Sequence, residues 1–336
     1  MKPRDIFPAW GSILSGHRPF LALEITRECP LRCPGCYSYQ PDHVGEGIAL
    51  RQLADYRGSD LVDRCLALVR QLRPIHVSIV GGEPLVRWRE LDELLPELGR
   101  LCREVQLVTS AVRSIPASWR RLKNLELVVS VDGLQPEHDL RRAPATYSRI
   151  LENISGHTVT VHCTVTKRML GRPEDLKEFT LFWSSRDEVR KIWFSLYTPQ
   201  ESEKTGERLS PQDRLDVLQE LRSIREESPK VYLPDSVLDG FRHPPQSPEE
   251  CIFAQVTTCV SADLESRIAP CQFGGRPVCA ECGCMAAAGF AAIGDYRLGG
   301  LVRLRRVFGL SSGIGKLWAG LRRRTPASPL SRRDIK

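Results

Sequence analysis

The stretch Cys29-Pro-Leu-Arg-Cys33-Pro-Gly-Cys36, followed by Tyr37, determines how the rest of the chain is interpreted. It comes directly after the apolar run at residues 20–25, which predicts a buried strand. Three thiolates can hold three irons of a four-iron cluster and leave the fourth iron open. A structural zinc ion or a disulfide is the alternative, but structural zinc usually has four protein ligands, and His17 and His43 both lie outside the loop.

Composition limits the class of protein. The 336 residues, 41% of them hydrophobic, suffice for one large domain with an appendage. Because the N-terminus has no apolar signal-peptide core, the twelve cysteines predict cluster ligands in a reducing cytosol rather than disulfides. No apolar stretch is long enough to cross a membrane. We therefore expect a cytoplasmic protein.

Strand and helix patterns alternate through residues 20–200. Strands are predicted at 20–25, 75–80, 105–109, 125–131, 158–165 and 191–197. Helices are predicted at 50–72, 91–103, 147–154 and 176–185. This alternation predicts an α/β fold, a partial (β/α)6 TIM-like barrel with its chemistry at the C-terminal strand ends. Residues 1–19 are interpreted as an irregular lead-in, and 201–250 as a Pro-rich linker with one helix at 211–227.

Two further motifs follow predicted strands. Gly81-Gly82-Glu83-Pro84 offers glycines that let the backbone approach a ligand and a carboxylate that can accept from an amine. Ser130 and Asp132 close the strand at 125–131; a turn stabilised by Asp132-Gly133 is the structural alternative.

In these motifs the chain resembles the radical S-adenosylmethionine (radical SAM) superfamily, with its C-x-x-x-C-x-x-C spacing, adjacent aromatic residue and GGEP motif. The resemblance implies the same barrel and a [4Fe-4S] cluster on Cys29, Cys33 and Cys36, whose open iron binds S-adenosyl-L-methionine (SAM). It also implies a flavodoxin- or ferredoxin-type electron donor. The residues it implies for contact with SAM are Tyr37, Gly81, Gly82, Glu83, Pro84, Ser130 and Asp132.

The strand at 158–165 carries residues with two interpretations. Alternation places Cys163 on the core face and His162 on the other, where a hydrogen-bonded barrel histidine is expected. Lys167 or Arg168 either meets the SAM carboxylate or is a solvated charge. Ser110 stands in Thr-Ser-Ala where many family members have Thr-Asn-Gly, which argues against a role for it.

A second group of six cysteines lies within 34 positions: Cys251, Cys259, Cys271, Cys279, Cys282 and Cys284. A hairpin predicted at 256–270 brings Cys271 near Cys251, and Cys279-Ala-Glu-Cys282 can hold one edge of a metal centre. Cys251, Cys271, Cys279 and Cys282 are the expected ligands of an auxiliary iron–sulfur cluster, with structural zinc as the alternative. Residues 251–290 resemble the SPASM and twitch extensions of radical SAM enzymes, the one-cluster twitch type more closely.

Residues 291–336 form a basic tail. The segment 297–336 carries a net charge of +10, against −3 for the rest of the chain. A helix predicted at 298–321 alternates leucines with arginines, which favours peripheral contact of residues 297–324 with an anionic membrane; a nucleic-acid arm or a barrel-capping helix is the alternative. No base-reading motif is present, so we expect no nucleic-acid partner.

The combined motifs predict a radical SAM enzyme that forms a 5′-deoxyadenosyl radical to modify an unactivated substrate. Within the superfamily they resemble the adenosylhopane synthase group, so a lipid or isoprenoid is the first expected substrate. The first alternative is a SPASM/twitch-type maturase or dehydrogenase that abstracts hydrogen from a peptide or small molecule. The second is a non-enzymatic zinc or nucleic-acid-binding protein.

Overall fold

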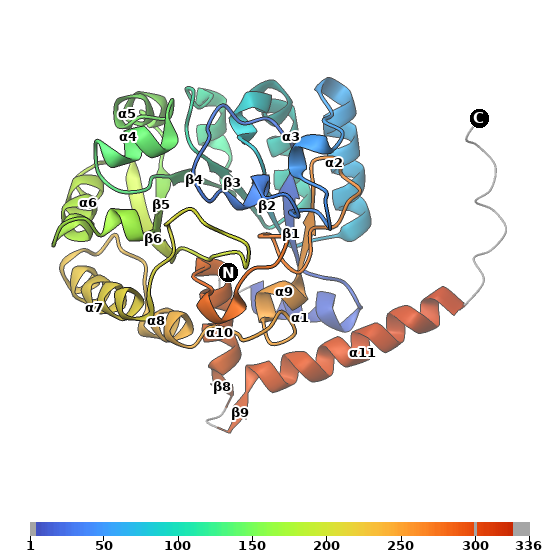
Figure 1. Cartoon of the computed structure of the whole chain (residues 1–336). Helices are drawn as coiled ribbons and strands as arrows, with labels where there is room; N and C mark the ends of the chain where they lie inside the picture. The colour runs from blue at the N-terminus through green and yellow to red at the C-terminus, as the bar shows by residue number, and fades with distance from the viewer. Residues whose placement is uncertain (1–4, 299–300, 325–336) are drawn as a thin grey trace.

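The computed structural model describes residues 5–298 and 301–324 and centres on one curved sheet. Its seven strands run in the order β6-β5-β4-β3-β2-β1-β7, and every neighbouring pair is parallel (Figure 1). The strands are β1 Phe20–Glu24, β2 His76–Val80, β3 Glu104–Thr109, β4 Leu125–Ser130, β5 Val159–Val165, β6 Val189–Leu196 and β7 Thr257–Val260. This parallel arrangement confirms the partial TIM-like barrel.

Helices alternate with the strands and cover the outer face of the sheet (Figure 1). Their bounds are α1 Ile6–Leu14, α2 Gly58–Leu72, α3 Trp88–Leu101, α4 Glu137–Arg142, α5 Tyr147–Ile154, α6 Asp175–Ser184, α7 Pro211–Glu227, α8 Asp235–Arg242, α9 Ile252–Val256, α10 Met285–Asp295 and α11 Leu304–Arg324. A short hairpin of β8 Arg297–Leu298 and β9 Val302–Arg303 precedes α11. Apolar residues of the strands and of α2, α3, α5 and α6 form the main core.

The seventh strand differs from the sequence-based expectation. Residues 256–270 were expected to form a local hairpin, but β7 joins the barrel sheet beside β1, with Leu21 opposite Thr258. A short hairpin is present as well: Val260 and Arg267 form an antiparallel bridge, the Ser261 N–H donates to the Ser266 carbonyl at 2.9 Å, and the Ile268 N–H donates to the Cys259 carbonyl at 3.0 Å. Pairing with β7 satisfies the backbone groups along the edge of β1, which local pattern could not reveal.

Two segments near the N-terminus also differ. The helix expected at 50–72 begins at Gly58, and Leu50–Gln52 form a separate 3-10 helix. Between them Asp55 accepts from the Arg27 backbone N–H at 3.1 Å and pairs with Arg87. The expected irregular lead-in contains α1. Its Trp10 donates to Ser311 of α11 at 2.7 Å, a partner 301 positions away.

The C-terminal segment is only partly helical. The helix expected at 298–321 begins at Leu304, because Arg297–Leu298 and Val302–Arg303 pair as the two-stranded hairpin. Helix α11 runs beside α1 and away from the barrel (Figure 1). The basic residues Arg332, Arg333 and Lys336 of the predicted tail lie outside the described residues.

Candidate active site

The motifs singled out from the sequence lie at one rim of the barrel. The cysteine loop follows β1, Gly81-Gly82-Glu83-Pro84 follows β2, Ser110 follows β3 and Asp132 follows β4. Because the strands are parallel, their carboxyl ends meet at the same side of the sheet. The sheet therefore brings these segments together around one opening.

Cys29, Cys33 and Cys36 are half-buried and lie close enough to disfavour one another's thiolates. Burial raises the pKa of Cys29 to about 12 and that of Cys36 to about 11. Backbone hydrogen bonding from Leu31 to Cys29, and from Ser38 and Tyr39 to Cys36, favours the thiolate forms. Such a set suits a cationic metal centre, which stabilises thiolates that burial alone would keep protonated.

The two glycines after β2 are required by the close packing of two loops. Gly81 has φ +80°, and a Cβ on it would lie 2.3 Å from Glu24 Cβ; Gly82 has φ +39°, and its Cβ would lie 2.3 Å from the Glu28 carbonyl oxygen. The Glu83 N–H donates to the same Glu28 carbonyl at 2.8 Å. The GGEP segment is thus fixed directly against the start of the cysteine loop.

The Glu83 carboxylate is buried and hydrogen-bonded to the protein itself. It accepts from the backbone N–H of Leu85 at 2.9 Å and of Ser110 at 2.7 Å, and from the hydroxyl of Thr109. Burial raises its pKa despite these donors. The Glu83 carboxylate therefore connects the end of β3 to the loop after β2 through hydrogen bonds.

Asp132 anchors two arginines of the short helix α4. Its Oδ2 accepts from Arg142 Nε at 2.7 Å and Arg141 Nε at 3.1 Å, and its Oδ1 accepts from the Thr164 N–H at 3.1 Å. Burial alone would raise the pKa of Asp132, but Arg142 and Arg141 outweigh it and hold the pKa well below its usual range. The carboxylate thus stays ionised and orients the two guanidinium groups.

Both arginines reach the cysteine loop, and Arg141 donates to the Pro34 carbonyl at 3.3 Å. Arg142 donates to Ser110 Oγ at 3.0 Å and lies near Cys33 and Cys36. The sequence reasoning missed this residue, because α4 is only six residues long and its contact depends on the barrel. It also undervalued Ser110, which contacts both Arg142 and Glu83.

The two basic residues considered for SAM are paired with carboxylates of the protein. Lys167 pairs with Asp213 at 2.7 Å and Arg168 with Glu207 at 3.3 Å, and both side chains are more than half exposed. His162 is hydrogen-bonded to Ser195 Oγ at 2.8 Å, and burial lowers its pKa to about 4, so it is an uncharged barrel residue near neutral pH. Ser130 lies opposite His162 in the sheet.

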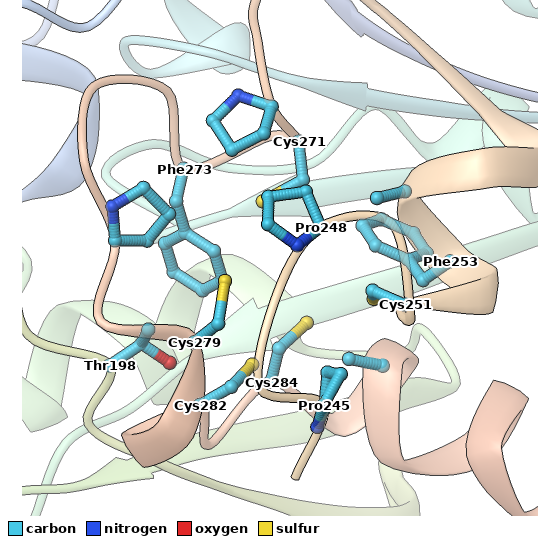
Figure 2. A pocket seen from close by; sticks show the side chains of 14 residues that line it. Thr198, Pro245, Pro248, Cys251, Phe253, Cys271, Phe273, Cys279, Cys282 and Cys284 are labelled. Atoms are coloured by element: carbon cyan, nitrogen blue, oxygen red, sulfur yellow. The ribbon is translucent and has the colours of Figure 1, made fainter.

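The second cysteine group surrounds an apolar pocket (Figure 2). Its empty volume is about 380 Å³, part of it open to solvent. The cysteines in its lining are Cys251, Cys271, Cys279, Cys282 and Cys284, with Pro245, Pro248, Phe253 and Phe273 among the apolar walls. The four expected ligands are thus brought to one pocket together with Cys284, which the sequence reasoning left out.

The remaining cysteines lie away from this pocket. Cys259 of β7 packs against Ala22 and Ile268, while Cys65, Cys102 and Cys163 belong to the main core. Among the described residues, no three His, Cys, Asp or Glu side chains are arranged to hold one metal ion. A [4Fe-4S] cluster does not require such convergence, because each thiolate binds a different iron.

A buried polar network joins the two cysteine sites. Glu24 at the end of β1 pairs with His43 at 2.8 Å and accepts from Ser261 Oγ at 2.6 Å, while His43 Nδ1 lies 3.2 Å from the Phe273 carbonyl oxygen. The Tyr37 ring packs against Phe273, with ring centroids 5.1 Å apart. Tyr37 therefore contacts the second site's loop, and its role toward SAM remains a prediction.

A polar pocket lies beside these loops. It has an empty volume of about 690 Å³, part of it open to solvent, and is lined by Gln40, Pro41, Asp42, Gln200, Glu201, Ser202, Gly275 and Arg276. The Glu201 N–H donates to the Arg276 carbonyl at 3.0 Å, so the end of β6 and the cysteine-rich segment form one wall.

Comparison with known proteins shows a family match over the barrel. The family model of the Radical SAM superfamily matches residues 23–180. The molybdenum cofactor biosynthesis protein 1 of Dictyostelium discoideum is 25% identical over 195 residues, which are 54% of this chain but only 29% of that protein. The chain thus spans less than a third of this curated relative.

Solved structures share the fold at low sequence identity. A structure described as native anSMEcpe with bound AdoMet has 17% identity and a TM-score of 0.56, over 90% of this chain and 98% of that one. SuiB of Streptococcus suis has 16% identity and a TM-score of 0.53, over 74% and 59% of the two chains. SuiB was also solved with its precursor peptide SuiA, at 15% identity and a TM-score of 0.52, over 77% and 61%.

Proposed function

Because the chain belongs to the radical SAM superfamily and is an enzyme, we propose that Cys29, Cys33 and Cys36 hold its SAM-binding [4Fe-4S] cluster. When bound, the cluster supplies the electron that cleaves SAM into methionine and a 5′-deoxyadenosyl radical. The observation that carries this proposal is that the three thiols, the GGEP loop and Arg142 share one rim of the barrel. The family assignment excludes the alternative of a non-enzymatic zinc or nucleic-acid-binding protein.

Residues beside these thiols can bind the amino and carboxylate groups of SAM. We assign the SAM carboxylate to Arg142, because its guanidinium is oriented by Asp132 and lies near Cys33 and Cys36. The backbone of Gly81-Gly82-Glu83, held by the Glu83 carboxylate, is assigned to the SAM amino group. We assign Ser130 and Asp132 to the side of the ribose or methionyl part of SAM.

We assign an auxiliary iron–sulfur cluster to the second cysteine pocket. Its thiols, its apolar phenylalanine and proline walls and its connection to the cysteine loop through Tyr37 and Phe273 support this assignment. A flavodoxin- or ferredoxin-type protein is the proposed electron donor, since the chemistry needs single electrons at low potential.

The first candidate substrate is a membrane lipid with an alkene, supported by an exposed apolar and basic surface on α1 and α11. Phe7, Leu310 and Leu317 are each at least 70% exposed, and Arg306 lies on the same helix α11. Apolar side chains among basic ones favour binding to anionic membrane surfaces. No helix among the described residues is long and apolar enough to cross a bilayer.

Membrane contact is tested by sedimentation with vesicles containing anionic or only neutral lipids. We expect binding to anionic vesicles, reduced about tenfold or more in Leu310→Ser/Leu317→Ser, because each buried leucine contributes about 1.5–3 kcal/mol. Leu181→Ser is the matched control, since Leu181 is 57% exposed on α6. Equal binding by all three proteins, or none to anionic vesicles, contradicts the membrane proposal.

In the lipid reaction, the 5′ carbon forms a bond to one alkene carbon, and the other alkene carbon takes up one electron and one proton. The test is anaerobic incubation of the reconstituted, reduced enzyme with SAM and a total lipid extract of its source, read by mass spectrometry. A lipid heavier by an adenosyl group supports the proposal. Free 5′-deoxyadenosine without such a lipid contradicts it and leaves the radical chemistry intact.

The polar pocket supports a second candidate substrate, a polar peptide or small molecule from which hydrogen is abstracted. Its acids Asp42 and Glu201 face the same space as Arg276, a lining that suits charged groups better than a hydrocarbon. In this reaction the 5′-deoxyadenosyl radical takes a hydrogen atom from a C–H bond of the substrate, which yields 5′-deoxyadenosine and a substrate radical. Deuterium transfer from a labelled polar extract into 5′-deoxyadenosine tests it.

A further inference from the structure

Five thiols line the second cysteine pocket, one more than a [4Fe-4S] cluster can use. Such a cluster has four irons, and each takes one terminal ligand. Cys279 and Cys282 form the conspicuous C-x-x-C pair in the sequence, whereas Cys284 stands outside that spacing. The positions of the five thiols must therefore indicate which one does not bind iron.

Packing separates Cys279 from the other four thiols. Cys251 and Cys284 are buried in one apolar cluster, and Cys271 and Cys282 pack against it together with Phe273. Cys279 is not a member of that cluster and begins a short 3-10 helix, Cys279–Glu281. In Figure 2 its sulfur lies beside the Phe273 ring.

Backbone hydrogen-bond donors also distinguish Cys279 from the other four thiols. Hydrogen bonding that favours the thiolate reaches Cys284 from Ala287 and Ala286, at the start of the eleven-residue helix α10. The corresponding donors are Phe253 and Ala254 for Cys251, Phe273 for Cys271, and the Cys284 backbone for Cys282. Within the described part of the chain no backbone donor acts on Cys279. Hydrogen bonds to ligating sulfurs stabilise iron–sulfur clusters.

The Cys282-Gly283-Cys284 turn is also fixed to the barrel. The Gly283 carbonyl accepts from the Leu196 N–H at 2.9 Å, and the Gly283 N–H donates to Thr198 Oγ1 at 2.9 Å. Arg214 donates to the Cys282 carbonyl at 3.1 Å. These contacts hold two thiols on either side of one glycine in a defined position, as a preorganised ligand pair requires.

Resting on the proposal that this pocket holds an auxiliary cluster, we infer that its ligands are Cys251, Cys271, Cys282 and Cys284, and that Cys279 is not a ligand. The C-x-C pair Cys282 and Cys284 then replaces the C-x-x-C pair that the sequence favoured. Cys279 remains a free thiol beside the cluster.

The test uses full-length protein in which Cys29, Cys33 and Cys36 are all changed to Ala, so that bound iron reports only the second pocket. Cys279→Ser and Cys284→Ser are introduced separately as a matched pair of identical chemical changes. Iron, acid-labile sulfide and the electron paramagnetic resonance spectrum of the reduced form are measured after anaerobic reconstitution. We expect about four irons per chain in the parent and in Cys279→Ser, with unchanged spectra. We expect Cys284→Ser to lose at least half of the iron or to show a shifted spectrum.

The outcomes distinguish failure of the auxiliary cluster from failure of its ligand assignment. A parent without iron overturns the auxiliary cluster itself. An iron-loaded parent whose iron is lost in Cys279→Ser, or retained with an unchanged spectrum in Cys284→Ser, overturns only the ligand assignment. If Cys284→Ser fails to fold by circular dichroism, Cys279→Ser alone decides, because retained iron supports the inference and lost iron refutes it.

Discussion

The two cysteine sites differ in how the chain builds them. Cys29, Cys33 and Cys36 come from one loop of eight residues after β1. The thiols of the second pocket come from the starts of two helices, a loop and a turn, spread over residues 251–284. The first site is therefore local in sequence, whereas the second exists only through tertiary contacts with β1 and β6.

The sites also differ in charge. Arg142, Asp132 and Glu83 lie around the first site, whose proposed ligand SAM is charged and exchangeable. Phenylalanines and prolines surround the second, which fits a permanently held centre that exchanges nothing but electrons. Each prediction below changes one side of this comparison.

The largest effect is expected from Cys33→Ala. Removing one of three ligands of the first cluster should abolish SAM cleavage, measured as formation of 5′-deoxyadenosine, while the second pocket keeps its iron. Cys65→Ala is the control, because Cys65 is a buried core residue of α2 and should keep both clusters. Retained cleavage in Cys33→Ala would refute the ligand assignment, and loss of all iron would refute the independence of the two sites.

The next largest effect is expected on stability, from Asp132→Asn. It leaves Arg142 without its buried counter-charge and Arg141 with Glu207 alone, which costs about 3–5 kcal/mol. Because the folded pKa of Asp132 lies below the unfolded value of about 3.9, its contribution is present above pH ~4 and is lost as pH falls through the folded pKa. The difference in unfolding free energy between wild type and variant should therefore shrink from pH 7 to pH 3. A difference independent of pH would contradict this.

A smaller effect is expected from Arg142→Ala on SAM affinity. Losing a charge-assisted hydrogen bond of about 1.5–3 kcal/mol should weaken SAM binding about 10- to 100-fold, measured by calorimetry on the reconstituted enzyme. Iron content should stay unchanged in both sites. Arg168→Ala is the matched control, since Arg168 is 64% exposed and pairs with Glu207. Equal losses in the two variants would argue against a specific role for Arg142.

The smallest effect is expected from Lys167→Ala. Its exposed pair with Asp213 contributes only about 0.2–1 kcal/mol. SAM affinity and cleavage should stay within twofold of wild type, because the Lys167 side chain is 52% exposed and paired with Asp213. A tenfold loss of SAM affinity would contradict this and indicate that Lys167 contributes to SAM binding at the first site.

The sequence by itself determined the barrel and the first site to a large extent. The apolar sequence pattern predicted the first and last residues of six strands to within three residues of the observed bounds. Helices α5 and α7 were predicted with the observed bounds. The spacing of Cys29, Cys33 and Cys36 and the two glycines after β2 were visible because their chemistry is carried by neighbours in the chain.

Only the tertiary structure decided which distant residues join these segments. It brought Arg142 from a helix of six residues to the cysteine loop and α1 to α11, and it made β7 a barrel strand. It also placed Cys284, rather than Cys279, among the closely packed thiols. These contacts join residues far apart in the chain or on elements too short to have a periodic pattern, and their free energy comes from burial and pairing that exist only once the chain has folded.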